Sequence, residues 1–337
     1  MKTRYQPAQL RDFEFAKHHD YETEDNINKE PAYLVDVFNR FRKNRAAKIA
    51  SIIILVIILM AIFVPILSSR AFDQQITEHL NLPPKMPLIE NLGILNGTKN
   101  GVNLYEQKGA LGTYYVFGTD TLGRDLWVRV WYGTRISLYM AFIAIVIDLF
   151  IGVSYGLISG YYGGRVDMVM QRIIEVLSGI PDTVIVTLLV LILKPGILSI
   201  TLALVIKGWI GMSRVTRAQV FKLKNQEFVL ASRTLGSSNM RIIFKEILPN
   251  ILGQLIVMSM FSIPSAIFTE AFLAFIGLGL AAPNASLGVL ISDGFKSFLS
   301  TPYMVIIPTI LLSILMFSFN ILANGLRDAF DPTMKDR

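Results

Sequence analysis

Cysteine is absent from the 337 residues, and histidine occurs only three times. The chain therefore has no disulfide, no thiol nucleophile and no thiolate metal site. His18 and His19 are adjacent, whereas two zinc ligands on one helix face are typically four residues apart. A zinc enzyme is not expected, and the fold must depend on packing alone.

A phosphate-binding loop is also missing, because no segment follows the pattern GxxxxGK[ST]. The nearest fragment, Gly294-Phe-Lys-Ser297, lacks the adjacent glycine and lysine. We therefore expect that this chain binds no cofactor, and that any ATP it uses is held by another protein.

Charged residues make up only 17% of the chain, while 53% of the residues are hydrophobic and the mean hydropathy is +0.50. This composition is too apolar for an ordinary soluble domain and predicts a membrane protein. The net charge of +7 lies mainly beside apolar segments. Membrane topology explains this distribution better than a nucleic-acid partner does.

Uncharged runs of about 20 residues are long enough to cross a bilayer core of ~30 Å as helices. We predict an all-α polytopic membrane protein with six transmembrane helices, of which the fourth is short and interrupted by Lys207 and Gly208. The predicted spans are 49–67, 136–159, 176–193, 197–213, 251–280 and 303–325.

Basic residues set the predicted orientation, because cytoplasmic flanks of membrane helices are rich in lysine and arginine. The segment before the first span carries five basic residues between Arg40 and Lys48. Both termini are therefore expected in the cytoplasm. The predicted regions are a cytoplasmic tail 1–45, a first helix 46–70, an extracellular segment 71–135, a five-helix core 136–326 containing the cytoplasmic loop 214–250, and a cytoplasmic tail 327–337.

Charged side chains within the predicted spans cost at least ~2.5 to 3.5 kcal/mol each at the bilayer centre. They should face the bundle interior, a cavity or each other. A proton-driven pump would use the carboxylates as a relay, but we favour structural pairs, such as Lys207 with a carboxylate. The candidates for packing or gating are Glu270, Asp148 and Lys207, and the two further charges are Glu175 and Asp182.

The loop segment 227–250 is charged and able to form helices between two apolar runs. Phe228, Ala231 and Leu235 recur at helical spacing, which predicts a short helix with a surface for another protein. Gly236 should break this helix, and Pro249 should end a second one before the next span. The alternative is an ordinary solvated loop.

Five stretches together resemble the oligopeptide and dipeptide permease subunits of ATP-binding-cassette importers, and specifically the second of the two paired permeases. The resemblance extends from about residue 32 to 332. It is carried by FGTDTLGRDLWVRVWYGTRISL (117–138), SGYYGGRVDMVMQR (159–172), EFVLASRTLGSSNMRIIFKEILPN (227–250), EAFLAFIGLGLAAPNASLG (270–288) and FNILANGLRDAFDP (319–332).

This resemblance implies a type I importer permease fold in the bacterial plasma membrane. Two homologous permease subunits would form the pathway, two ATPase subunits would dock beneath them with ATP and Mg, and an extracellular binding protein would deliver peptide. The chain itself would be a transport subunit and not an enzyme, with membrane lipid around it.

The resemblance also implies that the loop couples the permease to its ATPase through eight residues. Two of the letters depart from the pattern, because the family often has glutamate and two alanines where this chain has Leu230, Ala231 and Ser232. Asn324 likewise replaces a common acidic residue, and Glu227 is available for the missing carboxylate. The implied coupling residues are Glu227, Phe228, Leu230, Ala231, Ser232, Gly236, Leu248 and Pro249.

Three alternatives stay open from the sequence. Nickel and glutathione importer permeases look alike in all the stretches quoted. An ion-coupled secondary transporter could use Asp148 and Glu270, although it predicts inverted repeats and paired broken helices, which we do not find. A membrane scaffold without transport is the third.

Overall fold

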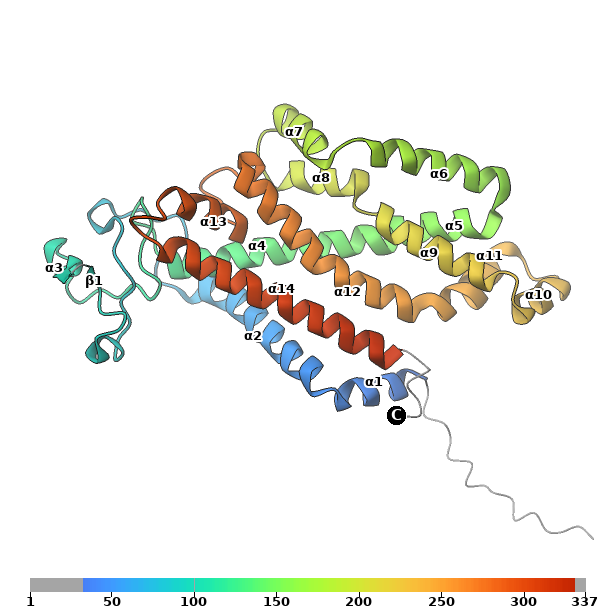
Figure 1. Cartoon of the computed structure of the whole chain (residues 1–337), viewed down its shortest axis with the longest axis horizontal. Coiled ribbons are helices and arrows are strands. Elements are labelled where there is room, and N and C mark those ends of the chain that lie inside the picture. Colours follow the sequence, from blue (N-terminus) through green and yellow to red (C-terminus); the bar gives the residue numbers. More distant parts are fainter. Residues whose placement is uncertain (1–32, 100, 331–337) are drawn as a thin grey trace, which may run out of the picture.

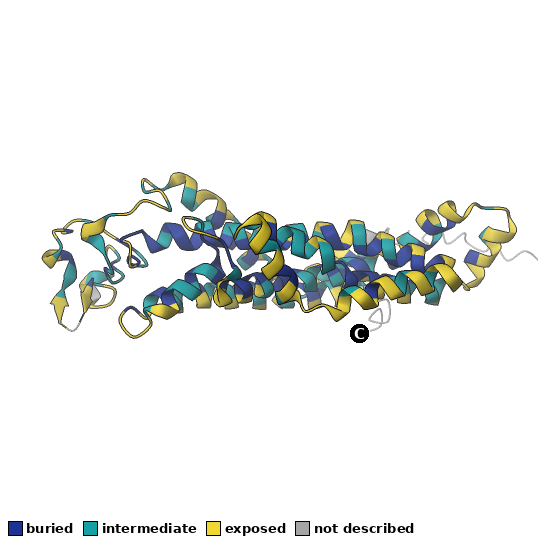
Figure 2. Cartoon of the chain, turned by 90° about the horizontal axis from the view of Figure 1, so that it is seen from above, coloured by how far each residue is buried: buried dark blue, intermediate teal, exposed yellow. Residues whose placement is uncertain are grey.

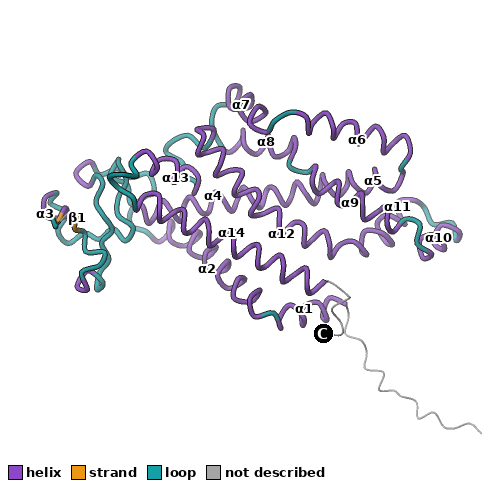
Figure 3. The backbone as a smooth tube through the Cα atoms, in the orientation of Figure 1, coloured by secondary structure: helices purple, strands orange, loops and turns teal. Residues whose placement is uncertain are grey.

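The computed structural model describes residues 33–99 and 101–330, so residues 1–32 of the predicted tail 1–45 and residues 331–337 of the predicted tail 327–337 lie outside the described residues. The chain is an elongated helical bundle with a loop-rich segment at one end (Figures 1 and 3). Its helices are α1 (Tyr33–Lys43), α2 (Arg45–Leu67), α3 (Leu104–Gln107), α4 (Leu126–Ile147), α5 (Val153–Tyr162), α6 (Gly164–Gly179), α7 (Asp182–Leu193), α8 (Ile197–Lys207), α9 (Ile210–Leu223), α10 (Glu227–Thr234), α11 (Asn239–Arg241), α12 (Leu248–Leu273), α13 (Leu287–Lys296) and α14 (Tyr303–Phe330).

Several helices continue through short π-helical turns or are joined by small elements. The π-helical segments are Asp148–Gly152, Ile242–Ile247 and Ala274–Leu278. Two 3-10 turns, Thr77–His79 and Glu90–Leu92, and the strands β1 (Thr98–Lys99) and β2 (Val102–Asn103) belong to the loop-rich segment. The strands pair antiparallel, with Thr98 opposite Asn103.

Within the described residues, five helical segments are long and apolar enough to cross a membrane, and a bent helix pair brings the number to six. The all-α polytopic prediction is confirmed. The straight span predicted at 176–193 is wrong, because α6 and α7 meet at 76°. Ile180 has extended φ and ψ angles at this bend, as expected for a residue before proline, and Pro181 cannot donate a helical hydrogen bond.

The second span begins at Leu126, ten residues before the predicted start at 136, and continues through the π turn to Tyr162. The Asp125 side chain caps the helix by accepting a hydrogen bond from the N–H of Trp127 at 3.0 Å. Arg129 is accommodated because it is almost completely buried and lies 3.5 Å from the Asp120 carboxylate. The sequence prediction looked for uncharged runs, so it left out the part of the helix that contains Arg129.

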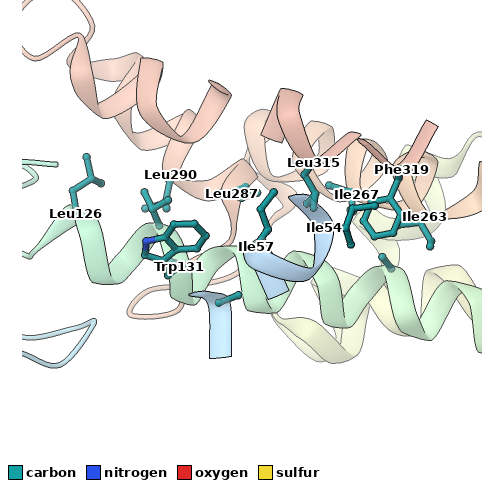
Figure 4. Close-up of a cluster of buried hydrophobic side chains, with 14 of the residues drawn as sticks. Ile54, Ile57, Leu126, Trp131, Ile263, Ile267, Leu287, Leu290, Leu315 and Phe319 are labelled. Carbon is teal, nitrogen blue, oxygen red and sulfur yellow. The ribbon is translucent and has the colours of Figure 1, made fainter. Parts of the chain in front are cut away.

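The main apolar core joins α2, α4, α12, α13 and α14 (Figure 4). Lipid is as apolar as these side chains, so close van der Waals packing holds the helices together. Large apolar side chains outside the core remain exposed along the bundle, as expected for surfaces that face lipid (Figure 2). The core residues drawn in Figure 4 include Ile54, Ile57, Leu126, Trp131, Ile263, Ile267, Leu287, Leu290, Leu315 and Phe319.

The segment between α2 and α4 is a small folded unit around Leu82, Tyr105 and Tyr115. The Tyr303 hydroxyl, at the start of α14, lies 3.0 Å from the carbonyl oxygen of Leu82 and 2.8 Å from that of Thr119. Ion pairs join Arg70 to Asp125 and Arg124 to Asp120. This unit is therefore fixed to the end of the bundle.

Three glycines allow α5 and α9 to approach closely. Gly152, Gly156 and Gly160 are spaced four residues apart, and a Cβ atom at each would come within 3.0 Å of atoms of α9 or the residue before it. At Gly156 the nearest atoms would be the Ser213 carbonyl oxygen and the Thr216 Cβ, both at 2.5 Å. Small residues at such spacing bring helix backbones into contact in membranes.

Replacing Gly156 with alanine should therefore force α5 and α9 apart and cost about 1–3 kcal/mol of stability. Gly211→Ala is the matched control, because a Cβ at Gly211 would meet no atom within 4 Å. Thermal unfolding of the purified transporter should show a lower melting temperature for Gly156→Ala only. Equal melting temperatures for both variants would contradict the close-contact interpretation.

Candidate coupling surface and intramembrane cavity

The helix α10 lies at the end of the bundle opposite the loop-rich segment (Figure 1). It ends at Thr234, and Gly236 follows with a left-handed φ of 81°. The N–H of Gly236 donates to the Arg233 carbonyl at 3.0 Å, and Ser238 then caps α11. The predicted helix and its break at Gly236 are confirmed, since glycine adopts this conformation without a Cβ clash.

Pro249 does not end a helix, and that prediction is wrong. The chain is helical from Asn239 through Pro249 into α12, and Pro249 lies in the first turn of α12. The preceding turn is π-helical, with the N–H of Leu248 bonded to the carbonyl of Ile243, five residues back. The helix changes its hydrogen-bond pattern immediately before the proline, which itself lacks an N–H. Leu248 is half-buried beside this turn.

Val229 anchors α10 to the rest of the molecule. Its side chain is completely buried in a cluster with Val220, Ile242, Ile243 and Ile247. The sequence did not indicate this residue, because its partners lie on either side of α10 in the chain and follow no local period. Val229 is the one buried residue of α10, so the other faces of this helix are not covered by the rest of the chain.

Those other faces carry the residues predicted for coupling. Phe228 is 41% exposed, Leu230 44% and Leu235 86%. Glu227, Ala231 and Gly236 are also exposed, whereas Ser232 is half-buried and its hydroxyl lies 3.1 Å from that of Ser237. We call the exposed residues Phe228, Leu230, Ala231 and Leu235 the α10 surface. Such an apolar surface at a water-facing tip is typical of a protein-binding site.

Polar contacts brace the bundle beside α10. The Asp167 carboxylate accepts two hydrogen bonds from Arg217, both at 2.6 Å, which ties α6 to α9. The Tyr161 hydroxyl at the end of α5 donates to the Asn239 side chain at 2.9 Å. Lys224 donates to the carbonyl of Gly160 at 2.9 Å. These pairs lie far apart in sequence, and only the motif at 159–172 pointed to part of them.

A cavity of about 640 Å³ opens between α4, α7, α8, α9 and α12. Asp148, Lys207 and Glu270, which the sequence identified separately, all line it, together with Asp182. The structure therefore brings the predicted intramembrane charges to one place. Glu175 is not among them, since it lies at an exposed position and pairs with Arg172.

Two of the cavity charges pair with each other. Lys207 lies 2.5 Å from the Asp182 carboxylate and donates to the carbonyl of Ile180 at 2.6 Å, so the predicted pairing of Lys207 with a carboxylate is confirmed. Asp148 is buried in the wall of the same cavity. These contacts are typical of charges held in place in a membrane interior.

Glu270 is 2% exposed and accepts a hydrogen bond from Ser137 at 3.1 Å. The Ser137 oxygen in turn accepts from the N–H of Leu287 at 3.3 Å. This chain of hydrogen bonds connects α12, α4 and the start of α13. A packing role for Glu270 follows directly from these contacts, while a gating role stays a prediction.

Membrane-spanning helices around a partly polar cavity are typical of a membrane transport protein. The chain belongs to the family of binding-protein-dependent transport system inner membrane components, whose family model matches residues 152–336. A second model, the N-terminal transmembrane domain of oligopeptide transport permease C, matches residues 32–84. The two matches together cover α2 and most of the bundle.

Curated relatives cover nearly the whole chain. A dipeptide transport system permease protein of Bacillus subtilis strain 168 is 41% identical over 305 residues, which are 90% of this chain and 87% of the relative. An oligopeptide transport system permease protein of the same strain is 43% identical over 302 residues, 89% and 90% of the two chains. The oligopeptide permease protein of Escherichia coli K12 is 39% identical over 303 residues, 90% and 91%.

A solved structure of the MetNI methionine ABC transporter in an inward-facing conformation aligns with a TM-score of 0.46 and 16% identity. The alignment covers 59% of this chain and 96% of the other. The similarity is too low to add to the family assignment.

The anchoring role of Val229 leads to a test by hydrogen exchange. Val229→Ala should cost on the order of 1–3 kcal/mol of local packing and speed amide exchange across residues 227–238, roughly tenfold for each 1.4 kcal/mol. Leu230→Ala is the matched control, since Leu230 is exposed in this chain. If both variants exchange like the unaltered chain, Val229 does not hold α10.

Proposed function

We propose that this chain is a permease subunit of an ATP-driven importer of peptides, forming half of the pathway and receiving its energy through the α10 surface. The observation that carries the proposal is the exposed apolar tip of α10, held by one buried residue, in a family of binding-protein-dependent transporters. The sequence contains no phosphate-binding loop of its own. ATP hydrolysis would then be carried out by separate ATPase subunits.

The contacts around α10 support a mechanical role. The surface needs to bind its ATPase in two orientations with different affinity, so that ATP binding favours one state of the membrane helices. The α10 helix follows α9 directly and packs against the π turn before α12, so it would move with both. Both helices also line the cavity that contains Asp148 and Glu270.

The cavity is only partly enclosed by the single chain, which supports a pathway completed by a second, homologous permease subunit. This arrangement is the one expected of a type I importer. The named relatives transport dipeptides or oligopeptides, so we propose peptide cargo in preference to nickel or glutathione. The ion-coupled alternative is not favoured by the family to which the chain belongs.

We infer that the α10 end faces the cytoplasm of a bacterial cell. The helix α1 and the last turn of α14 lie toward the same end of the bundle as α10 (Figure 1). The basic residues between Arg40 and Lys48 and those of the loop 214–250 lie in these regions. The folded unit at 68–125 would then face outside, where a peptide-binding protein delivers its cargo.

Introducing a charge into the α10 surface tests the proposal. In Ala231→Glu an unpaired carboxylate would be buried against the ATPase, at a cost of a few kcal/mol, so ATP-dependent peptide uptake should fall by at least about tenfold. Uptake is measured in proteoliposomes that contain the complete transporter, and immunoblotting verifies the amount of this chain in the membrane.

The control is Leu299→Glu, at a residue that is 99% exposed in the loop between α13 and α14, at the opposite end of the molecule. It should leave uptake unchanged. Unaltered uptake in Ala231→Glu, with normal membrane levels, would refute coupling through the α10 surface.

A further inference from the structure

A second hollow, of about 330 Å³, lies between α2, α4, α12 and α14. Its lining is aliphatic and aromatic, apart from Arg135. Two of the lining residues, Ile263 and Phe319, lie next to each other in the core view (Figure 4). We call this hollow the α2–α4 groove.

The α2–α4 groove and the cavity lie on different faces of α4. Ala144 and Asp148 line the cavity, whereas Leu138, Phe142 and Ile145 line the groove. At 3.6 residues per turn, these two sets are centred roughly 110° apart around the helix. The groove therefore faces away from the side that carries the intramembrane charges. Phe142 is 63% exposed there, as expected for a surface in contact with lipid.

The depth of the groove matches one leaflet of a bilayer. Arg135 and Ile145 both line it and are ten residues apart on α4, which corresponds to roughly 15 Å at 1.5 Å per residue. The apolar core of a bilayer is ~30 Å thick, so the groove reaches about halfway across. Its shallow end carries Arg135, since α4 begins at Leu126 beside the loop-rich segment.

Arg135 is available for an anion at that shallow end. Its guanidinium lies 4.8 Å from the centre of the Tyr132 ring, and within the described residues no carboxylate is within ion-pair distance of it. Tyr132 is itself held, because it stacks on Phe72 at 3.7 Å and its hydroxyl lies 3.3 Å from the Asn284 side chain. A planar guanidinium with free donors favours the paired oxygens of a phosphate.

We propose that the α2–α4 groove binds one phospholipid from the leaflet on the side of the loop-rich segment. An acyl chain fills the apolar groove, and the lipid phosphate binds the Arg135 guanidinium. An acyl chain there packs α2 against α4 and α12 on the side that the protein leaves open. Charge complementarity at the shallow end and the one-leaflet depth favour a phospholipid, which carries a phosphate at the membrane surface and an acyl chain directly below it.

Native mass spectrometry of the complete transporter, released from phosphatidylglycerol nanodiscs, tests this site. The unaltered complex should keep a tightly held lipid, and Arg135→Gln should lower its retention by roughly fivefold, the effect of one basic residue near a phosphate. Arg135→Lys should restore part of it. Lys296→Gln, at an exposed residue of α13, is the control and should retain the lipid.

A phosphate-free lipid separates the headgroup from the acyl chain. In nanodiscs of galactosyl diacylglycerol the unaltered complex should hold the lipid as weakly as Arg135→Gln holds phosphatidylglycerol. Equal retention of both lipids, or equal retention by Arg135→Gln and the unaltered complex, would overturn the proposal.

Filling the groove provides a test that leaves the arginine in place. Ile62 lies at the rim of the groove and is 41% exposed, so Ile62→Trp places a bulky ring in the groove. Ile66→Trp places the same ring one turn away on α2, outside the groove. Only Ile62→Trp should lose the lipid while the complex stays assembled. Retention by both variants, or a protein helix in the groove in a cryo-EM map of the complex, would also overturn the proposal.

Discussion

The close backbone contact between α5 and α9 is the interaction on which the rest of the structure depends. In lipid the burial of apolar side chains gives little drive for helices to associate, so approach at small residues supplies the contact energy. Gly152, Gly156 and Gly160 allow this close approach along more than two turns of helix. The α10 helix follows α9, and Tyr161 at the end of α5 bonds Asn239 just beyond α10. In the proposed coupling, a force applied to α10 would therefore reach two packed helices.

Charge is distributed unevenly around α4 and α12. On one side, Asp148, Lys207 and Glu270 line a cavity, in which Lys207 pairs with Asp182 and Glu270 accepts a hydrogen bond from Ser137. On the other side, the α2–α4 groove is apolar except at its shallow end. A bilayer penalises unpaired charge, so the polar side must face water, cargo or a partner subunit, and the apolar side must face lipid. The same two helices thus separate a transport surface from a lipid surface.

Sequence reasoning recovered the features that follow from local chemistry. Apolar runs gave the membrane helices, Gly236 gave the break after α10, and Lys207 was correctly expected to pair with a carboxylate. It failed where the outcome depends on distant partners. Arg129 extends α4 beyond the uncharged run because Asp120 lies beside it, and Val229 anchors α10 through residues on other helices.

Two prolines account for differences between the predicted and the observed helices. Pro181 bends a span that composition alone presents as straight, because the residue before it leaves the helical region. Pro249 was expected to stop a helix, but a π turn before it lets the helix continue.

The cysteine-free sequence allows the central claim to be tested directly with a single cysteine at Ala231 and a bifunctional cross-linker in the assembled transporter. We predict a cross-link from position 231 to an ATPase subunit whose yield changes when ATP is added; no cross-link there, with efficient labelling of the same cysteine, would contradict coupling through α10.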